Sequence, residues 1–127
     1  MASDVRVTGF DHLVLNVADV DRSLAFYADA LGLEPLRVEE WRRGEVGFPS
    51  VRLDPSTIID LLRAPRGEGN VDHFCLVVAG TDLAALEQSG RFEVEHGVAR
   101  RWGARGEGTS LYVRDPDGNV VELRSYG

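Results

Sequence analysis

An alternation of apolar and polar positions predicts a β-strand over residues 10–17. Successive side chains of a strand point to opposite faces, so Leu13, Leu15 and Val17 share one face and His12 lies on the other. We expect the uniformly apolar face to pack against helices. The histidine is therefore expected on the face of the sheet that the helices leave uncovered.

The same pattern returns 61 residues later, in a strand predicted over residues 71–78. His73 follows an aspartate in this strand, as His12 does in the first. A second echo, 62 residues apart, relates Ile-Asp-Leu around Asp60 to Val-Glu-Leu around Glu122. Each half of the chain thus opens with a strand that carries a histidine and ends with a strand that carries an acid, which indicates an internal repeat.

The other elements of the first half are a helix and three strands. The helix is predicted to begin after Asp19 or Asp21, either of which can cap it, and to end at Gly32. Its apolar stripe has helical spacing and consists of Leu24, Tyr27, Ala28 and Leu31. Strands are then predicted at residues 34–40, 46–53 and 57–63.

The second half repeats this plan after a linker at residues 65–70, which is rich in glycine. A short helix is predicted from Asp82 to Gly90. A turn at residues 115–119, with Pro116 and Gly118, favours a hairpin. The extended segments of this half are expected near residues 71–78, 92–94, 98–101, 112–114 and 120–123. The prediction is one α+β domain of 127 residues, with βαβββ module one at 8–64 and βαβββ module two at 71–127.

The composition excludes several classes of function. A net charge of −7 argues against a nucleic-acid or anionic-membrane partner. All 14 basic residues are arginine, which excludes Schiff-base chemistry and P-loop phosphate binding. Cys75 is the single cysteine, so no internal disulfide and no thiolate metal cluster is expected. No segment has the apolar length of a signal peptide or a membrane helix, and the expectation is a cytoplasmic protein.

The repeated histidines and acids favour a metal site. A lone histidine on a strand is usually a satisfied core or surface residue, but His12 and His73 occupy equivalent positions and each has an acid in its own half. Two imidazoles with one or two carboxylates suit Zn, Ni, Co, Mn or Fe(II). Glu122 is the expected carboxylate ligand. Asp60, between apolar neighbours, is either a ligand or a nearby proton acceptor, or else a buried acid paired with an arginine.

The glycine-rich segment 103–108 lies beside candidate substrate-binding residues. Arg101 or Arg105 would meet an anionic substrate, and Trp102 and Tyr112 would line its pocket, with the segment as a lid. The alternative is a solvated loop, with the two aromatic side chains packed in the core.

Several motifs together resemble the vicinal oxygen chelate superfamily, the group of glyoxalase I, extradiol dioxygenases, fosfomycin-resistance enzymes and bleomycin-binding proteins. The motifs are Asp-His-Leu-Val-Leu-Asn-Val at 11–17, Ser-Leu-Ala-Phe-Tyr at 23–27 with Leu-Gly-Leu at 31–33, Asp-His at 72–73, and Tyr-Val-Arg-Asp-Pro-Asp-Gly-Asn-Val-Val-Glu at 112–122. They span nearly the whole chain, and the last is the most specific. The resemblance implies a cupped, half-barrel mixed sheet with helices on its outer face, built around one divalent metal.

The resemblance also implies site residues and activities. It places metal ligands at His12, His73 and Glu122, and Asp60 where glyoxalase I has a glutamate. It implies a glyoxalase-like lyase or isomerase whose small substrate chelates the metal through neighbouring oxygens, with Glu122 or Asp60 as proton carrier. The alternatives are an Fe(II) extradiol dioxygenase and a metal-free drug- or metabolite-binding protein of the bleomycin-resistance kind. Members of this family are commonly dimers, so the resemblance also implies a homodimer.

Overall fold

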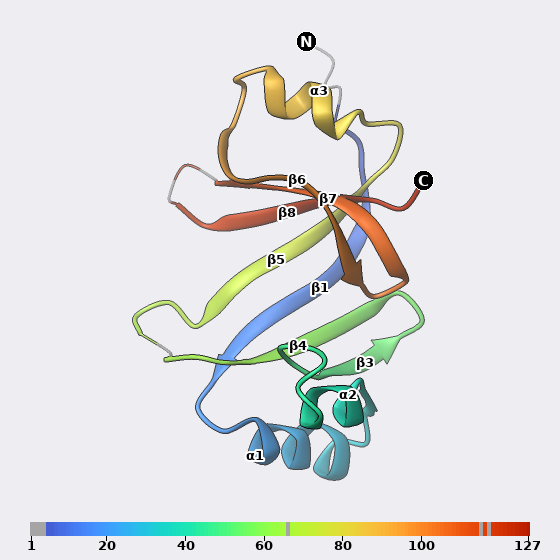
Figure 1. Ribbon diagram of the computed structural model, residues 1–127, viewed down its shortest axis with the longest axis vertical. Coiled ribbons are helices and arrows are strands. Elements are labelled where there is room, and N and C mark those ends of the chain that lie inside the picture. The colour runs from blue at the N-terminus through green and yellow to red at the C-terminus, as the bar shows by residue number, and fades with distance from the viewer. Residues whose placement is uncertain (1–4, 66, 115, 117) are drawn as a thin grey trace. The chain divides into compact units, whose positions relative to one another are not determined.

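The computed structural model describes residues 5–65, 67–114, 116 and 118–127, and the chain forms two compact units (Figure 1). The N-terminal unit is His12–Asp72. The C-terminal unit is His73–Gly127 together with the chain up to Asp11. Strand β1 (Val7–Val17) therefore contributes its beginning to the C-terminal unit and its end to the N-terminal unit.

Apart from the short additional helix α2, the N-terminal unit has the order strand, helical segment and three strands. Its β1 portion pairs in parallel with β4, β4 pairs antiparallel with β3, and β3 pairs antiparallel with β2. The elements after β1 are α1 (Val20–Leu24), the π-helix η1 (Ala25–Ala30), β2 (Glu34–Leu36), α2 (Val38–Arg42), β3 (Ser50–Asp54) and β4 (Thr57–Arg63).

The C-terminal unit repeats this topology. Strand β5 pairs in parallel with β8, β8 pairs antiparallel with β7, and β7 pairs antiparallel with β6. The elements are β5 (Val71–Val78), α3 (Leu83–Gln88), β6 (Glu93–Gly103), β7 (Gly106–Arg114) and β8 (Val120–Ser125). Both halves thus have the predicted βαβββ order and the same strand neighbours.

The helix caps follow from local side-chain chemistry. The carboxylate of Asp19 accepts a hydrogen bond from the Arg22 amide at the start of α1, and Asp82 does the same for Ala85 in α3. Gly32 ends the first helical segment with a φ of 76°, a value that glycine adopts without strain. These caps confirm the predicted starts of both helices.

The apolar strand faces pack against the helices as the alternation predicted. In the N-terminal unit, Val17, Ile59 and Leu61 form one cluster with Val20 and Leu24 of α1. The cluster of the C-terminal unit joins β-strand residues to α3 and contains Leu76, Val78, Leu83, Leu86, Leu111, Val113, Val121 and Leu123. In each unit the histidine and the acid lie on strand positions of the opposite face.

The structure corrects four predicted elements. The predicted strand 34–40 ends at Leu36, because Val38 and Trp41 have helical spacing and pack on the core as part of α2. The strand predicted to begin at residue 46 begins at Ser50. The first helix changes from α to π geometry after Leu24, so the predicted apolar stripe breaks and Leu31 is exposed.

The fourth correction concerns the extended pieces near 92–94 and 98–101, which belong to the single long strand β6. Register shifts lie within it, between Val94 and His96 and between His96 and Ala99, and these interrupt the alternation that sequence patterns detect. The glycine-rich segment is the tip of the β6–β7 hairpin rather than a long loop.

Two predicted segments lie partly outside the described residues. The linker 65–70 contains Arg66, and the hairpin turn 115–119 contains Asp115 and Asp117. The hairpin itself is confirmed by the antiparallel pairing of Arg114 with Val120. In the part of the chain that the structure describes, no helix has the length and apolar character needed to cross a membrane.

Leu61 tests the packing of the N-terminal unit, because its side chain is fully buried in the cluster beneath α1. We expect Leu61→Ala to lower the free energy of unfolding by about 2–5 kcal/mol through lost burial and a cavity. The matched control is Leu53→Ala on β3, whose side chain is 47% exposed, with an expected change within about 0.5 kcal/mol. Urea denaturation measures both, and equal losses would contradict this core assignment.

Candidate metal centre

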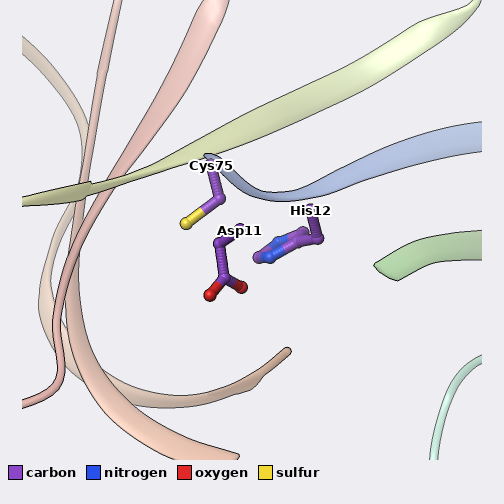
Figure 2. A group of neighbouring side chains, drawn as sticks. All are labelled: Asp11, His12 and Cys75. Carbon is purple, nitrogen blue, oxygen red and sulfur yellow. The ribbon is translucent and has the colours of Figure 1, made fainter. Parts of the chain in front are cut away.

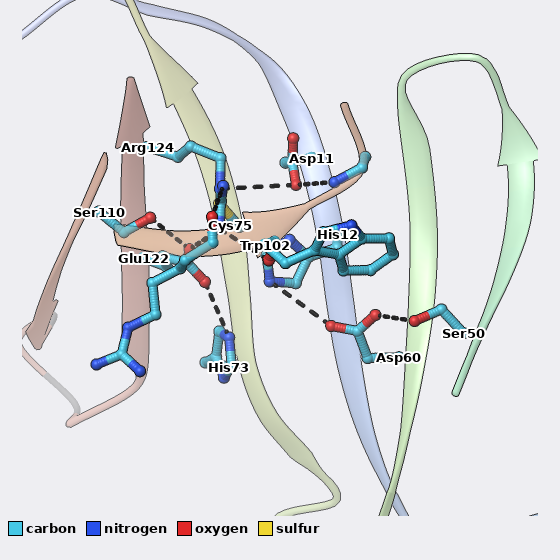
Figure 3. A network of polar contacts seen from close by, with 12 residues as sticks. Asp11, His12, Ser50, Asp60, His73, Cys75, Trp102, Ser110, Glu122 and Arg124 are labelled. Carbon is cyan, nitrogen blue, oxygen red and sulfur yellow. Dashed lines mark hydrogen bonds and ion pairs between the residues drawn. The ribbon is translucent and has the colours of Figure 1, made fainter. Parts of the chain in front are cut away.

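In the C-terminal unit, neighbouring strands bring His73 and Glu122 into contact (Figure 3). Strands β5 and β8 run in parallel with Cys75 opposite Glu122, which places His73 one same-face position away. The distance from His73 Nε2 to Glu122 Oε1 is 3.1 Å. The Ser110 hydroxyl on β7 donates a hydrogen bond of 2.7 Å to the other oxygen, Glu122 Oε2. The Glu122 carboxylate is fully buried.

The N-terminal unit contains the corresponding arrangement (Figure 3). His12 on β1 lies beside Asp60 on β4, with 3.9 Å between His12 Nε2 and Asp60 Oδ2. The Ser50 hydroxyl on β3 donates a hydrogen bond to Asp60 Oδ1. His12 and Asp60 are each 3% exposed and Ser50 is fully buried. The described partners of Asp60 thus include a hydroxyl and an imidazole.

A serine, an acid and a histidine on three adjacent strands therefore occur once in each unit. The histidines are 61 residues apart, the acids 62 and the serines 60. Sequence reasoning found the histidines and the acids but missed Ser50 and Ser110. The only signal for them is the near-equal spacing of the repeat, because serine is common and neither residue lies in a distinctive motif.

A buried arginine completes the C-terminal arrangement. Arg124 is fully buried two residues after Glu122, and its NH2 group donates hydrogen bonds to Glu122 Oε2 at 2.9 Å and to the Trp102 carbonyl at 3.0 Å. Its NH1 group donates to the Arg101 carbonyl at 2.8 Å. Burial alone would lower the pKa of Arg124, but the negative charge of Glu122 raises it above the ordinary value. Arg124 is therefore a buried cation.

Asp11 is the second buried carboxylate of this network (Figure 3), and Figure 2 shows its side chain beside Cys75. Its Oδ2 accepts a hydrogen bond of 3.0 Å from the Ala104 amide and lies 3.9 Å from Arg124 Nε. Its Oδ1 accepts a hydrogen bond from the Tyr126 hydroxyl. Burial, and then this bond to Asp11, raise the pKa of Tyr126 to about 12, so the phenol remains a neutral donor. The network ties the start of β1 to the β6–β7 hairpin.

The glycines of the hairpin tip make room for this network. A Cβ atom on Gly103 would lie 2.6 Å from Arg124 Cζ and 2.8 Å from both Asp11 Oδ2 and the Tyr126 hydroxyl. A Cβ atom on Gly108 would lie 2.9 Å from Arg124 NH1. A side chain at either position would have to displace these buried neighbours. The segment predicted as a lid or a solvated loop is thus a tight turn that packs on buried charges.

The candidate substrate-binding residues are divided between two places. Tyr112 lies beside His73, with 5.1 Å between ring centroids, and Arg101 Cζ stands 5.3 Å from the Tyr112 ring centroid. Burial, and then the charge of Glu122, raise the pKa of Tyr112. Arg105 instead stacks on Tyr126, 4.4 Å from its ring centroid. Trp102 contributes its carbonyl to Arg124.

The third histidine, His96, was not singled out from the sequence. It is exposed on β6 and packs edge-on against Tyr112, 5.3 Å between ring centroids. No histidine stands at the equivalent position of the first half, so the repeat did not draw attention to His96. For the same reason, His96 serves as a control residue below.

The donor atoms of each unit fit a divalent metal. Each pair presents an imidazole nitrogen and a carboxylate oxygen, the ligands that Zn and other first-row divalent ions take in proteins. In each acid, one oxygen accepts a hydrogen bond from serine and the other lies toward the histidine. Hydrogen bonds to the outer oxygen are typical of carboxylates that ligate metals.

Comparison with known proteins gives a consistent family match. Residues 9–123 match the model of the "Glyoxalase/Bleomycin resistance protein/Dioxygenase superfamily". The chain is 29% identical to "Virulence protein STM3117" of Salmonella typhimurium over 91% of this chain and 83% of that protein. It is 32% identical to "Glyoxalase domain-containing protein RDO1" of Mycosarcoma maydis over 94% of this chain and 69% of that protein.

Among solved structures, the chain resembles the Mn(II)-bound glyoxalase from Novosphingobium aromaticivorans, with a TM-score of 0.71 and 25% identity. The match covers 95% of this chain and 40% of that chain. It agrees with the predicted α+β fold of βαβββ modules and a curved mixed sheet.

Gly103 tests the buried network directly. We expect Gly103→Ala to lower the free energy of unfolding by about 1–3 kcal/mol, because the added methyl group must displace Arg124, Asp11 or Tyr126. The control is Gly47→Ala, where a Cβ would meet no atom within 4 Å. Chemical denaturation of both variants measures the difference. A Gly103→Ala protein as stable as the control would show that this close approach is not required.

Proposed function

This chain belongs to the Glyoxalase/Bleomycin resistance protein/Dioxygenase superfamily, and on that premise we propose that it is a metal-dependent enzyme of the glyoxalase kind. The proposed reaction is a lyase or isomerase step on a small substrate with two neighbouring oxygen atoms. The proposed ligands of one divalent ion are His12, His73 and Glu122, with Asp60 as a fourth ligand or as a proton acceptor beside the ion.

One observation carries this proposal: the arrangement of a buried serine, a buried acid and a histidine occurs in both units. A single buried acid beside a histidine is common in protein cores, because each side chain satisfies the hydrogen bonding of the other. Two such pairs at equivalent repeat positions favour a common role, and we propose that this role is to ligate one metal ion. A divalent cation would also offset the free-energy cost of burying the Asp60 and Glu122 carboxylates.

The donor set limits the metal to a class. Two imidazoles with one or two carboxylates suit Zn, Ni, Co, Mn or Fe(II). The similarity to a glyoxalase with bound Mn(II) supports a divalent first-row ion without choosing among these elements.

The side chains divide the chemical work. The bound ion would act as a Lewis acid toward the two substrate oxygens. Glu122 Oε1 or Asp60 Oδ2 would accept and return the substrate proton, because the opposite oxygen of each acid is held by a serine hydroxyl. Tyr112, beside His73, would form a wall of the substrate pocket.

Positive charge next to that wall suits an anionic substrate. Arg101 is exposed and stands over the Tyr112 ring, so its guanidinium group is proposed to meet a carboxylate or phosphate of the substrate. Arg105 stays a candidate for the same role, and Trp102 stays a candidate for lining the pocket. A small-molecule substrate agrees with the members that give the family its name.

The rival functions use the same fold differently. An Fe(II) dioxygenase would use His12, His73 and Glu122 with iron, so the identity of the bound element separates it from a lyase. A metal-free drug- or metabolite-binding protein would have no use for these four ligand side chains, three of which are buried. A homodimer and a cytoplasmic location stay predictions from the sequence.

Metal content tests the proposal. After equilibrium dialysis against each ion in turn, elemental analysis is expected to find about one divalent ion per chain, since one ligand set with donors from both halves forms one site. We expect His12→Ala, His73→Ala and Glu122→Ala each to lose it, because every variant removes a proposed ligand.

The matched control is His96→Ala, which removes the exposed third histidine and is expected to keep the full metal content. Absence of metal from the unmodified protein with every ion would overturn the enzymatic proposal and favour a metal-free binding protein. Retention of metal in the three ligand variants would place the ion elsewhere.

A further inference from the structure

We infer that Arg124 is a positioning residue of this site: its guanidinium group holds Glu122 Oε2 and thereby directs Glu122 Oε1 to the metal side (Figure 3). This inference rests on the proposed function and adds a residue to it. Arg124 would touch neither metal nor substrate, and would act through Glu122.

The two oxygens of Glu122 have different surroundings. Oε2 accepts hydrogen bonds from Arg124 NH2 at 2.9 Å and from the Ser110 hydroxyl at 2.7 Å. Oε1 lies 3.1 Å from His73 Nε2. Two donors on Oε2, one of them charged, oppose rotation of the carboxylate about its last bond. The oxygen that faces the histidine is thus specified by the groups behind it.

The guanidinium group is itself held on several sides. It donates to the carbonyls of Arg101 and Trp102, which are consecutive residues of β6. Gly108 lies so close that a Cβ there would stand 2.9 Å from NH1. The Arg124 side chain is fully buried, so no water can replace a displaced contact at low cost. A guanidinium group held this rigidly can fix the orientation of the Glu122 carboxylate.

Charge balance with Asp11 alone does not explain this arrangement. Arg124 Nε is 3.9 Å from Asp11 Oδ2, whereas NH2 is 2.9 Å from Glu122 Oε2, so the closer ion pair is with the proposed ligand. The repeat offers an internal contrast. The residue two positions after Asp60 is Leu62, whereas the residue two positions after Glu122 is Arg124. The cation at this position is thus present in only one half of the repeat.

The contrast suggests different tasks for the two acids. Glu122 has a serine and an arginine behind it, which suits a permanently oriented ligand. In the N-terminal unit, the Ser50 hydroxyl donates to Asp60, and position 62 is a leucine. We place the positioning role of Arg124 on the Glu122 side of the site only.

The test measures metal affinity in Arg124→Gln and Arg124→Lys proteins. The probes are Zn(II) and Co(II) alone, with dissociation constants from competition against a chromophoric chelator. Loss of a residue that orients a ligand typically weakens metal binding about 10–100-fold, and we expect that weakening with stoichiometry unchanged. The visible spectrum of bound Co(II) is expected to change, because the Glu122 oxygen is no longer held in place.

Two variants are used so that the test can still be read if one of them does not fold. Arg124→Lys keeps a positive charge between Asp11 and Glu122, so it is expected to fold even if Arg124→Gln does not. Its single ammonium group cannot reach Glu122 and both β6 carbonyls together, so weakened metal binding is still expected. Circular dichroism establishes the folded state of each variant before titration.

Tyr126→Phe is the matched control, because it removes a hydrogen bond to Asp11 in the same network and leaves Glu122 untouched. We expect lower thermal stability with a metal dissociation constant within twofold of the unmodified protein. Folded Arg124 variants with unchanged metal affinity and an unchanged Co(II) spectrum would overturn the positioning role and leave Arg124 as a structural cation. Failure of the unmodified protein to bind either ion would overturn the proposed function, and this inference with it.

Discussion

The structure depends on the cost of burying the Glu122 carboxylate. An ionised carboxylate withdrawn from water is destabilised by several kcal/mol unless donors and positive charge surround it. Glu122 receives a hydroxyl, a guanidinium group and a histidine from three strands. Arg124 in turn donates to the Arg101 and Trp102 carbonyls, which links β8 to β6 of the β6–β7 hairpin. One buried charge therefore organises the C-terminal unit.

The two units show how a duplicated plan can diverge. Both keep a serine, an acid and a histidine on adjacent strands. Only the C-terminal plan has an arginine two residues after its acid, and leucine stands there in the N-terminal plan. Gly103 and Gly108 leave the space that the guanidinium group fills. Arg124 therefore depends on these two glycines as well as on the acids and carbonyls around it.

Sequence patterns predicted the parts of the fold that depend on periodicity. The two βαβββ plans, the apolar strand faces and the caps at Asp19 and Asp82 are confirmed, because each rests on local alternation or capping chemistry. Helix α2 was missed because five residues carry too short a pattern. The buried role of Arg124 was missed because arginine on an alternating strand ordinarily faces water, and only a distant partner reveals otherwise.

The central claim is that donors from both halves hold one metal ion. Crystals grown with Zn(II) or Mn(II), measured on both sides of the absorption edge of that metal, would locate the ion by its anomalous scattering. We predict one peak per chain, coordinated by His12 together with His73 and Glu122. A peak held by the residues of one half alone, or a metal at neither histidine, would contradict the account.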